Sequence, residues 1–160
     1  MYHWINGIKI IKENIIMTRI NADYNPKGLT DQHLLAEYRE LPMVHSALRK
    51  SLKTRKVNDI IKGIPKDYTL NKGHVTFFYN KLSFLNNRYN RLVEELNNRG
   101  FKLDSSRVLD NSGIPLEFFN DWVANDADED IIKERLREKI SMKKGWYKYY
   151  GKQLENNFEV

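Results

Sequence analysis

The sequence predicts an all-α protein, a single compact domain of three main helices with irregular loops and an aromatic C-terminal tail. Its 160 residues suffice for one ordinary domain with its own core. Hydrophobic residues make up 41% and aromatic residues 12% of the chain, which is enough to fold without metals or disulfides. Apolar residues recur at helical spacing, and no stretch alternates convincingly as a β-strand does.

The first predicted helix covers residues 30 to 55. Thr30 or Asp31 suits its N-terminal cap. Apolar side chains then recur at helical rather than alternating spacing, at Leu34, Leu35, Tyr38, Leu41 and Leu48. Pro42 removes one backbone hydrogen bond, so we expect a kink there. Residues 57 to 70 contain a glycine and a proline and are interpreted as a connector.

The second predicted helix covers residues 73 to 99 and ends at Gly100, which suits a helix C-terminus. Its apolar stripe steps by alternating fours and threes through Phe78, Leu82, Leu85, Tyr89, Leu92 and Leu96. Arg88 and Glu95 fall outside this stripe. We therefore expect one buried face and one solvated face that carries these charges.

The rest of the chain contains a long loop and a third helix. Turn residues and one short aromatic piece predict that residues 101 to 125 form a loop with a single helical turn. The third helix is expected over residues 128 to 142, where acidic residues crowd the start and basic residues the end, as the helix dipole favours. After Gly145 comes the aromatic segment W-Y-K-Y-Y-G-K.

The composition narrows the classes of function that the sequence could have. Lysine and arginine outnumber the acids 27 to 21, for a net charge of +6, so a polyanion such as nucleic acid is a natural partner, although an ordinary basic enzyme remains an alternative. The absence of cysteine excludes disulfides, thiolate nucleophiles and cysteine metal sites. The four histidines lack metal-ligand spacing, so no metal is expected. No segment approaches the roughly 20 apolar residues of a membrane span, and we expect a soluble cytoplasmic monomer without membrane contact.

Two groups of side chains could carry chemistry. On the first helix, Arg39 and Glu40 are expected to face outward near Gln32 and His33. The alternative is a solvated face with weak ion pairs. On the third helix, a basic edge at Arg135 and Lys139 continues into the lysines and rings of the tail. Those rings either bind nucleic acid or close the core.

Four motifs in order resemble the phage endonuclease V type of pyrimidine-dimer DNA glycosylase. They are M-T-R-I-N at 17 to 21, D-Q-H-L-L-A-E-Y-R-E-L-P at 31 to 42, G-H-V-T-F-F-Y at 73 to 79 and W-Y-K-Y-Y-G-K at 146 to 152. The resemblance covers residues 17 to 152, which we interpret as the glycosylase domain. Residues 1 to 16 form an extension outside it, and residues 153 to 160 form a polar tail.

The resemblance implies a compact all-α enzyme that repairs ultraviolet damage without metal or cofactor. Its substrate would be double-stranded DNA containing pyrimidine dimers or abasic sites. The family removes one base of a cyclobutane dimer and nicks the strand by β-elimination, and it flips the adenine opposite the lesion. By motif match the nucleophile is the α-amine of Thr18, and Glu40 is the catalytic carboxylate. The expected DNA-binding residues are Arg19, Gln32, His33, Tyr38, Arg39, Arg135, Lys139, Trp146, Tyr147 and Lys148.

This chemistry has a condition at the N-terminus. An α-amine has a reference pKa near 7.7–8.0, so roughly a tenth of it is the neutral nucleophile at pH 7. If residues before Thr18 are retained, its nitrogen is an amide and forms no imine. The functional product then starts at Met17 and loses that methionine, or the extension is cleaved, or the chain is a non-catalytic binder of damaged DNA. A general AP lyase is a further alternative, because Met43 replaces an arginine usual in the family.

Overall fold

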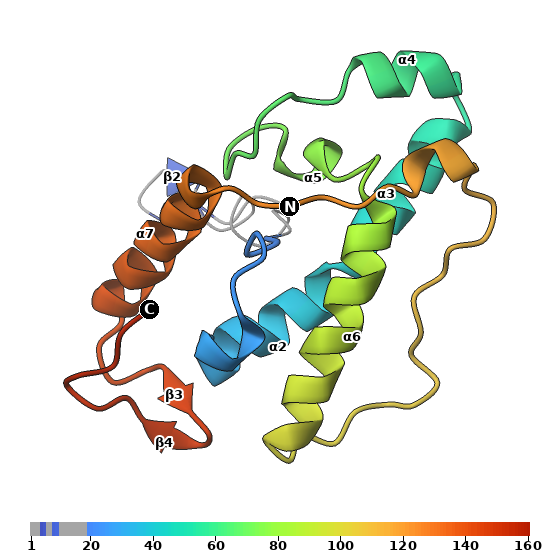
Figure 1. Cartoon of the computed structure of the whole chain (residues 1–160). Helices are drawn as coiled ribbons and strands as arrows, with labels where there is room; N and C mark the ends of the chain where they lie inside the picture. The colour runs from blue at the N-terminus through green and yellow to red at the C-terminus, as the bar shows by residue number, and fades with distance from the viewer. Residues whose placement is uncertain (1–3, 6–7, 10–18) are drawn as a thin grey trace.

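The computed structural model describes residues 4–5, 8–9 and 19–160. Helices dominate it and the strands are short, which confirms the predicted all-α class (Figure 1). The α-helices are α2 (Asp31–Glu40), α3 (Pro42–Leu52), α4 (Val57–Lys62), α5 (His74–Phe77), α6 (Leu82–Asn98) and α7 (Asp126–Met142). The 3-10 helices are η1 (Pro26–Gly28) and η2 (Leu116–Phe118). The strand β1 (Trp4–Ile5) pairs antiparallel with β2 (Ile8–Lys9), and β3 (Lys148–Tyr149) pairs antiparallel with β4 (Lys152–Gln153).

The predicted helix over residues 30 to 55 is two helices, α2 and α3. Thr30 caps α2, and its side chain accepts a hydrogen bond from the backbone N–H of His33. Pro42 occupies the first position of α3, where its missing N–H costs nothing and its fixed φ suits a helix start. The prediction of one kinked helix was wrong here, because the proline begins a new helix.

The predicted long helix over residues 73 to 99 is also divided. α5 ends at Phe77 and α6 begins at Leu82, with Lys81 in a non-helical conformation between them. The Lys81 ammonium donates a hydrogen bond to the Phe77 carbonyl at 2.8 Å, so a side chain takes the place of the interrupted helical ladder. Gly100 has a φ of +84° after α6, as predicted for a C-terminal glycine.

Two further predictions about the connections can be judged. The segment interpreted as a connector contains α4, which sequence patterning missed because its six residues are too few to show a helical period. The long loop holds η2 as its one helical turn, as expected. None of the helices in the described ranges is long and apolar enough to cross a membrane.

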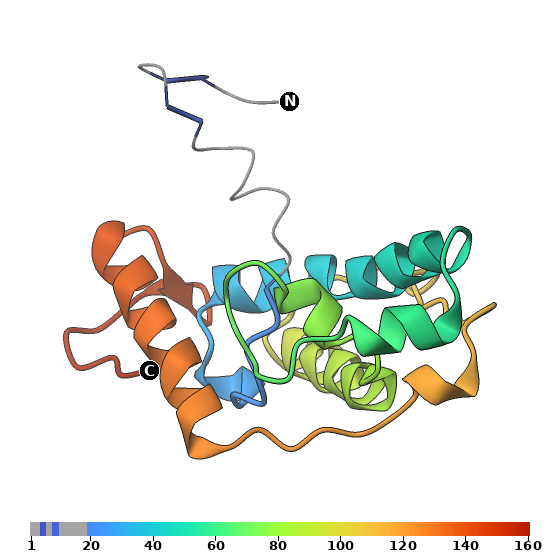
Figure 2. The same cartoon turned by 90° about the horizontal axis from the view of Figure 1, so that it is seen from above.

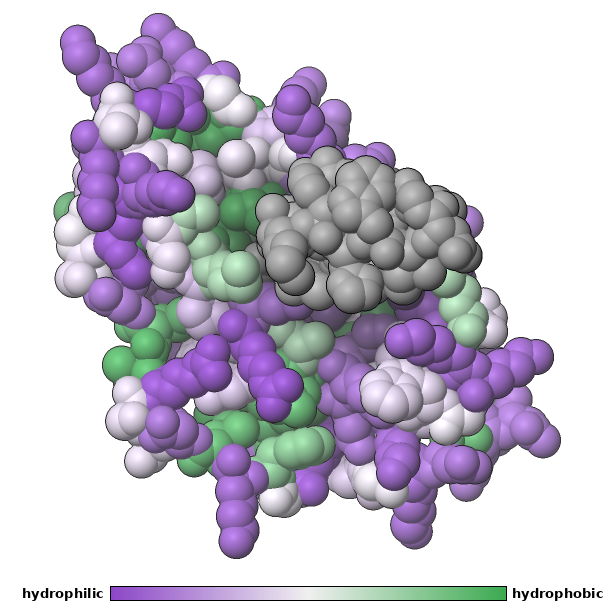
Figure 3. All heavy atoms as spheres, turned by 180° about the vertical axis from the view of Figure 1, so that it is seen from behind, coloured by the Kyte–Doolittle hydropathy of each residue, from purple (hydrophilic) through white to green (hydrophobic). Residues whose placement is uncertain are grey.

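The core lies where α2 and α3 pack against α6. Leucines and aromatic residues from these helices, from η2 and from α7 are fully buried, among them Leu34, Leu41, Leu48, Phe78, Leu85, Leu92, Phe118 and Ile132. α7 lies at one side of the molecule and α4 at the other in both cartoon views (Figures 1 and 2). On the face shown in Figure 3, hydrophilic side chains cover much of the visible surface, with smaller hydrophobic areas between them.

Arg88 and Glu95 lie in the interior, so the predicted solvated face of the long helix was wrong at these positions. Arg88 is 1% and Glu95 3% exposed. The guanidinium of Arg88 binds both carboxylate oxygens of Glu37 on α2 and donates to the Tyr24 carbonyl at 2.9 Å. A charge outside the apolar stripe is therefore buried because α2 presents an opposite charge to it.

The aromatic tail folds back onto α2 and α6. Arg99 lies 4.8 Å from the ring centres of both Tyr149 and Tyr150. Asp31 accepts hydrogen bonds from Arg99 at 2.9 Å and from the backbone N–H groups of Tyr150 and Gly151 at 3.1 and 2.8 Å. These two tyrosines thus attach the β3–β4 hairpin to the helical core.

Candidate active site

A small cavity of about 110 Å³ lies between the N-terminal segment, α2 and α7. It is lined by Arg19, Asn21, His33, Ala36, Glu37, Glu40, Arg135 and Leu136. The α2 residues stand three, four and seven positions after His33, which is one face of a helix. The sequence analysis grouped Glu40 with Arg39 on an outward face. The structure instead turns Glu40 toward Arg19 and Arg135, while Arg39 is exposed.

Glu40 contributes a partly exposed carboxylate to the lining of this cavity. It is half-buried, and its Oε2 accepts a hydrogen bond from the backbone N–H of Arg19 at 3.3 Å. Burial raises its pKa, and the Arg19 N–H together with the guanidinium groups of Arg19 and Arg135 opposes that rise. A carboxylate with a raised pKa is a stronger base than an ordinary glutamate.

Arg19 and Arg135 line the cavity beside this carboxylate, and Lys139 extends their positive charge along α7. Arg19 comes from the N-terminal segment, and Arg135 and Lys139 stand one turn apart on α7. Burial lowers the pKa of each, and mutual repulsion between Arg135 and the other two lowers the pKa of Arg19 and Lys139 further. Clustered cations of this kind favour the arrival of an anion such as a phosphate group.

His33 and Gln32 join the aromatic segment to α2. The His33 ring stacks on Tyr147 with centres 4.6 Å apart. Burial, together with Arg135 and Lys139, lowers the pKa of His33 to about 4, so the ring is neutral at neutral pH. The Gln32 amide donates to the Trp146 carbonyl at 2.7 Å. It also accepts from the backbone N–H of residue 148 at 2.9 Å.

The remaining predicted site residues are placed differently. Tyr38 is 4% exposed and stacks on Tyr89 at 5.4 Å, away from the Glu40 cavity. Trp146 is 56% exposed, and Lys148 is exposed beside it. Sequence reasoning left open whether the tail rings close the core or face outward, and the structure divides them between the two. Thr18, the predicted nucleophile, lies outside the described residues.

Asn21 and Glu37 line the cavity and were not predicted as site residues. The Asn21 amide donates to Glu37 at 2.6 Å, and Glu37 also binds Arg88. Glu37 stands three residues before Glu40 on the helix, so its helical position was the available signal. Because its oxygens are taken by protein donors, Glu37 supports the wall of the cavity and leaves Glu40 as the carboxylate open to a ligand.

Comparison with known families adds one finding to this geometry. Residues 17–108, more than half of the chain, match the family described as pyrimidine dimer DNA glycosylase. The chain belongs to the pyrimidine dimer DNA glycosylase family. The resemblance seen in the sequence is thereby confirmed, and with it a place in the repair of pyrimidine dimers in DNA.

In this member of the pyrimidine dimer DNA glycosylase family, the matched range covers only part of the site. Arg19 and all of α2, including Glu40, lie inside it. Arg135, Lys139 and the aromatic segment lie beyond residue 108, and the structure brings them to the matched part. The Glu40 cavity therefore joins residues that are distant in sequence.

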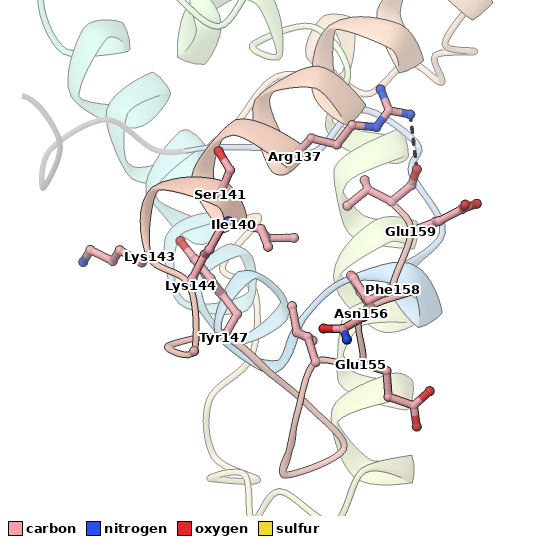
Figure 4. Close-up of a pocket in the computed structure, with 13 residues that line it drawn as sticks. Arg137, Ile140, Ser141, Lys143, Lys144, Tyr147, Glu155, Asn156, Phe158 and Glu159 are labelled. Atoms are coloured by element: carbon pink, nitrogen blue, oxygen red, sulfur yellow. Dashed lines mark hydrogen bonds between the residues drawn. The ribbon is translucent and has the colours of Figure 1, made fainter.

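A larger cavity of about 750 Å³ lies between α7 and the C-terminal tail (Figure 4). Arg137, Lys143 and Lys144 line it, and Arg137 donates to the Val160 carbonyl at 3.4 Å. Its lysines are exposed, and Glu40 is not among its lining residues. For a glycosylase the smaller cavity is the better candidate, because it combines a partly buried carboxylate with cations.

Among the residues that the structure describes, no three histidine, aspartate or glutamate side chains converge in a way that could hold a metal ion. The acids around the cavity are engaged with protein groups: Glu37 with Arg88, and Glu40 with the Arg19 N–H.

Proposed function

We propose that the α-amine of Thr18 removes one base of a pyrimidine dimer through an imine, and that the same intermediate allows strand cleavage. Glu40 is the carboxylate that assists this reaction. The resulting activities are DNA N-glycosylase and AP lyase. The active product begins at Thr18, because only a free amine forms an imine.

The observation that carries the proposal is the hydrogen bond from the Arg19 N–H to Glu40 at 3.3 Å. Thr18 is joined to Arg19 by a peptide bond, so bond lengths alone keep its α-nitrogen within about 4 Å of the Arg19 nitrogen. A nucleophile on residue 18 is therefore close to the carboxylate at the cavity.

The steps follow from ordinary imine chemistry. The neutral amine attacks C1′ of the damaged nucleotide, and the bond from C1′ to the base breaks with its electron pair leaving on the base. Opening of the sugar gives a protonated imine, which acidifies the C2′ proton. Removal of that proton expels the 3′ phosphate by β-elimination. Glu40 stabilises the cationic transition state and accepts protons in the later steps.

The cations around the cavity support DNA as the substrate. Arg19, Arg135 and Lys139 can neutralise backbone phosphates beside the reacting sugar. Dimer-containing DNA is already distorted, so bending it and flipping a nucleotide out costs less than in intact duplex. Selectivity for the lesion then comes mainly from deformability.

Borohydride trapping on a dimer-containing duplex tests the proposal. Protein started at Met17 is compared with the full 160-residue chain, and mass analysis identifies each N-terminus. We expect a covalent adduct on Thr18 only in protein whose N-terminal residue is Thr18. An equal adduct from an intact longer chain would mean a side-chain nucleophile and would refute the α-amine mechanism.

The same assay separates the two alternatives. An adduct on abasic duplex without one on dimer duplex would indicate a general AP lyase. Met43, which is 44% exposed on α3, is the substitution to examine in that case. Tight binding to dimer duplex without any adduct would indicate a non-catalytic binder of damaged DNA.

A further inference from the structure

Both backbone polar groups of Ile20 are held by buried side chains. The Ile20 N–H donates to Nε2 of His74 at 2.8 Å, and the Ile20 carbonyl accepts from the Tyr68 hydroxyl at 2.7 Å. Ile20 is fully buried, and both partners are less than 5% exposed. The two peptide groups that flank Ile20 are therefore each held by a residue about fifty positions away in sequence.

The His74 ring has one tautomer that satisfies its contacts. Since Nε2 accepts from an N–H, the ring proton is on Nδ1, which donates to the Thr69 carbonyl at 2.7 Å. Burial lowers the pKa of His74 to about 4, and the cations Arg19 and Arg135 contribute to the lowering. The ring is thus a neutral, oriented acceptor at neutral pH.

The two side chains are held in a rigid surrounding. The Tyr68 ring stacks on Trp122 at 5.8 Å and meets the edges of His74 and Phe78 at 5.5 and 6.1 Å. Gly73, with a φ of +98°, begins the turn that brings His74 into place. A Cβ atom at residue 73 would lie 3.0 Å from the Pro65 side chain. Both this close contact and the left-handed φ therefore favour glycine at this position.

We propose that His74, with Tyr68, is a positioning residue for the reaction, because it fixes the peptide group between Arg19 and Ile20 and so aligns Arg19 with Glu40. This inference rests on the proposed function, since alignment matters only if the nucleophile is on that segment. The Arg19 N–H to Glu40 bond at 3.3 Å is one residue from the peptide that His74 holds. A displacement of about 1 Å at a reacting atom can slow the chemical step by about 100-fold.

Two substitutions of His74 separate positioning from general stability. In His74→Asn the amide nitrogen can still donate to the Thr69 carbonyl, but no atom reaches the Ile20 N–H. In His74→Gln the longer side chain restores an acceptor near the original Nε2. As a control, His45→Asn changes another buried histidine, which contacts Asn86 on α6 and lies away from the Glu40 cavity.

The readout is the single-turnover rate of borohydride-trapped adduct, measured beside DNA affinity. We expect His74→Asn to slow trapping by about 10- to 100-fold with unchanged affinity for dimer duplex. His74→Gln should recover most of the rate, and His45→Asn should leave it unchanged. Equal rates in His74→Asn and His74→Gln, whether both slowed or both normal, would overturn the proposal.

Two further measurements keep the test decisive. If His74→Asn does not fold, Tyr68→Phe removes only the hydroxyl that binds the Ile20 carbonyl, and a normal trapping rate in that variant would overturn the proposal. Hydrogen exchange at the Ile20 amide reports the contact itself and should accelerate in His74→Asn but not in His74→Gln. Wild-type protein that gives no adduct would refute the proposed function, whereas unchanged Ile20 exchange in His74→Asn would refute the positioning role alone.

Discussion

Glu37 and Glu40 stand three residues apart on one helix face, yet they differ in what surrounds them. Glu37 is fully enclosed and its oxygens receive hydrogen bonds from Asn21 and Arg88. Glu40 is half-buried and receives one backbone N–H from Arg19. A buried carboxylate whose oxygens already accept hydrogen bonds from the protein stabilises the fold. A partly exposed carboxylate that accepts fewer hydrogen bonds can still interact with a ligand. These surroundings support Glu40, rather than Glu37, as the proposed catalytic carboxylate.

Replacing Glu40 by glutamine tests that assignment. Glu40→Gln keeps the shape but removes the negative charge and the basic oxygen. We expect base release from dimer duplex to fall by at least about 100-fold, with DNA binding retained because a repulsion toward phosphate is removed. Gel analysis of cleavage measures the loss, and Glu94→Gln, at an exposed position of α6, is the control. Near-normal turnover by Glu40→Gln would contradict the role.

The raised pKa of Glu40 predicts where activity declines with acid. Burial raises its pKa above the ordinary value of 4.5, Glu37 adds to the rise, and Arg19 and Arg135 limit it. Since the ionised form is active, kcat/KM should fall as the pH drops through a pKa above 4.5. Adding NaCl should move this acidic fall in kcat/KM to higher pH, because salt screens the two arginines that stabilise the ionised carboxylate. An acidic fall in kcat/KM with a pKa at or below the ordinary glutamate value would argue against Glu40 as the titrating group.

At the scale of elements, the contact between Arg88 and Glu37 joins α6 to α2 in the interior. Burial by itself lowers the pKa of Arg88, but the Glu37 carboxylate and its hydrogen bonds more than offset this, so the pKa is raised. Arg88 also binds the Tyr24 carbonyl at 2.9 Å. One guanidinium thus fixes α6, α2 and the turn that follows the N-terminal segment.

Removing one charge of this pair should destabilise the fold strongly. Glu37→Gln leaves the buried Arg88 with only the more distant and partly exposed carboxylate of Asp23, 4.0 Å away, which costs about 3–5 kcal/mol in free energy of unfolding. Urea denaturation followed by circular dichroism measures the loss, and Glu94→Gln on the outer side of α6 should change stability by less than about 0.5 kcal/mol. An equal effect of both substitutions would mean that the buried pair contributes no more than a surface charge.

At the scale of the whole molecule, the site depends on α7 lying beside α2. Arg135 comes from α7 and Arg19 from the N-terminal segment, yet both line one cavity with Glu40. Lys139, one turn after Arg135 on α7, adds its charge to theirs. The start of α7 is set by Asn125, which forms a capping box with Asp128. The hairpin that follows α7 is tied to α2 through Asp31. The capping box thus fixes where α7 begins, and the hairpin contact after its C-terminal end helps to hold the helix beside α2.

This arrangement predicts how DNA binding responds to salt. The binding constant falls as salt rises, so log K against log salt has a negative slope. Arg135→Ala and Lys139→Ala should each make this slope less steep by about one, as expected for the loss of one phosphate contact. Lys62→Ala changes an exposed lysine of α4 at the opposite side of the molecule and should leave the slope unchanged. Fluorescence anisotropy on undamaged duplex over a salt series measures all three. Equal slopes in the three variants would contradict a localised DNA-binding edge.

The sequence by itself determined the helical class and the family. Helical periodicity and four collinear motifs were enough for this, since both are local properties of the chain. They also selected Glu40, Arg19, Arg135 and Lys139 as site residues. The structure brings Arg19 and Arg135 to the cavity that Glu40 lines, and it places the charge of Lys139 near these two arginines. The interpretation of Thr18 as nucleophile came from motif match alone and stays a prediction.

Only the tertiary structure decided which polar residues are buried and which side chains lie beside Glu40. Helical position alone assigned Arg88 to solvent, because periodicity describes one helix and contains no information about a charge on its neighbour. The contacts of Ile20 with His74 and Tyr68 join positions about fifty residues apart, and no local pattern encodes them. Burial and hydrogen bonding depend on what the rest of the chain places nearby, so this part of the site becomes visible only after folding.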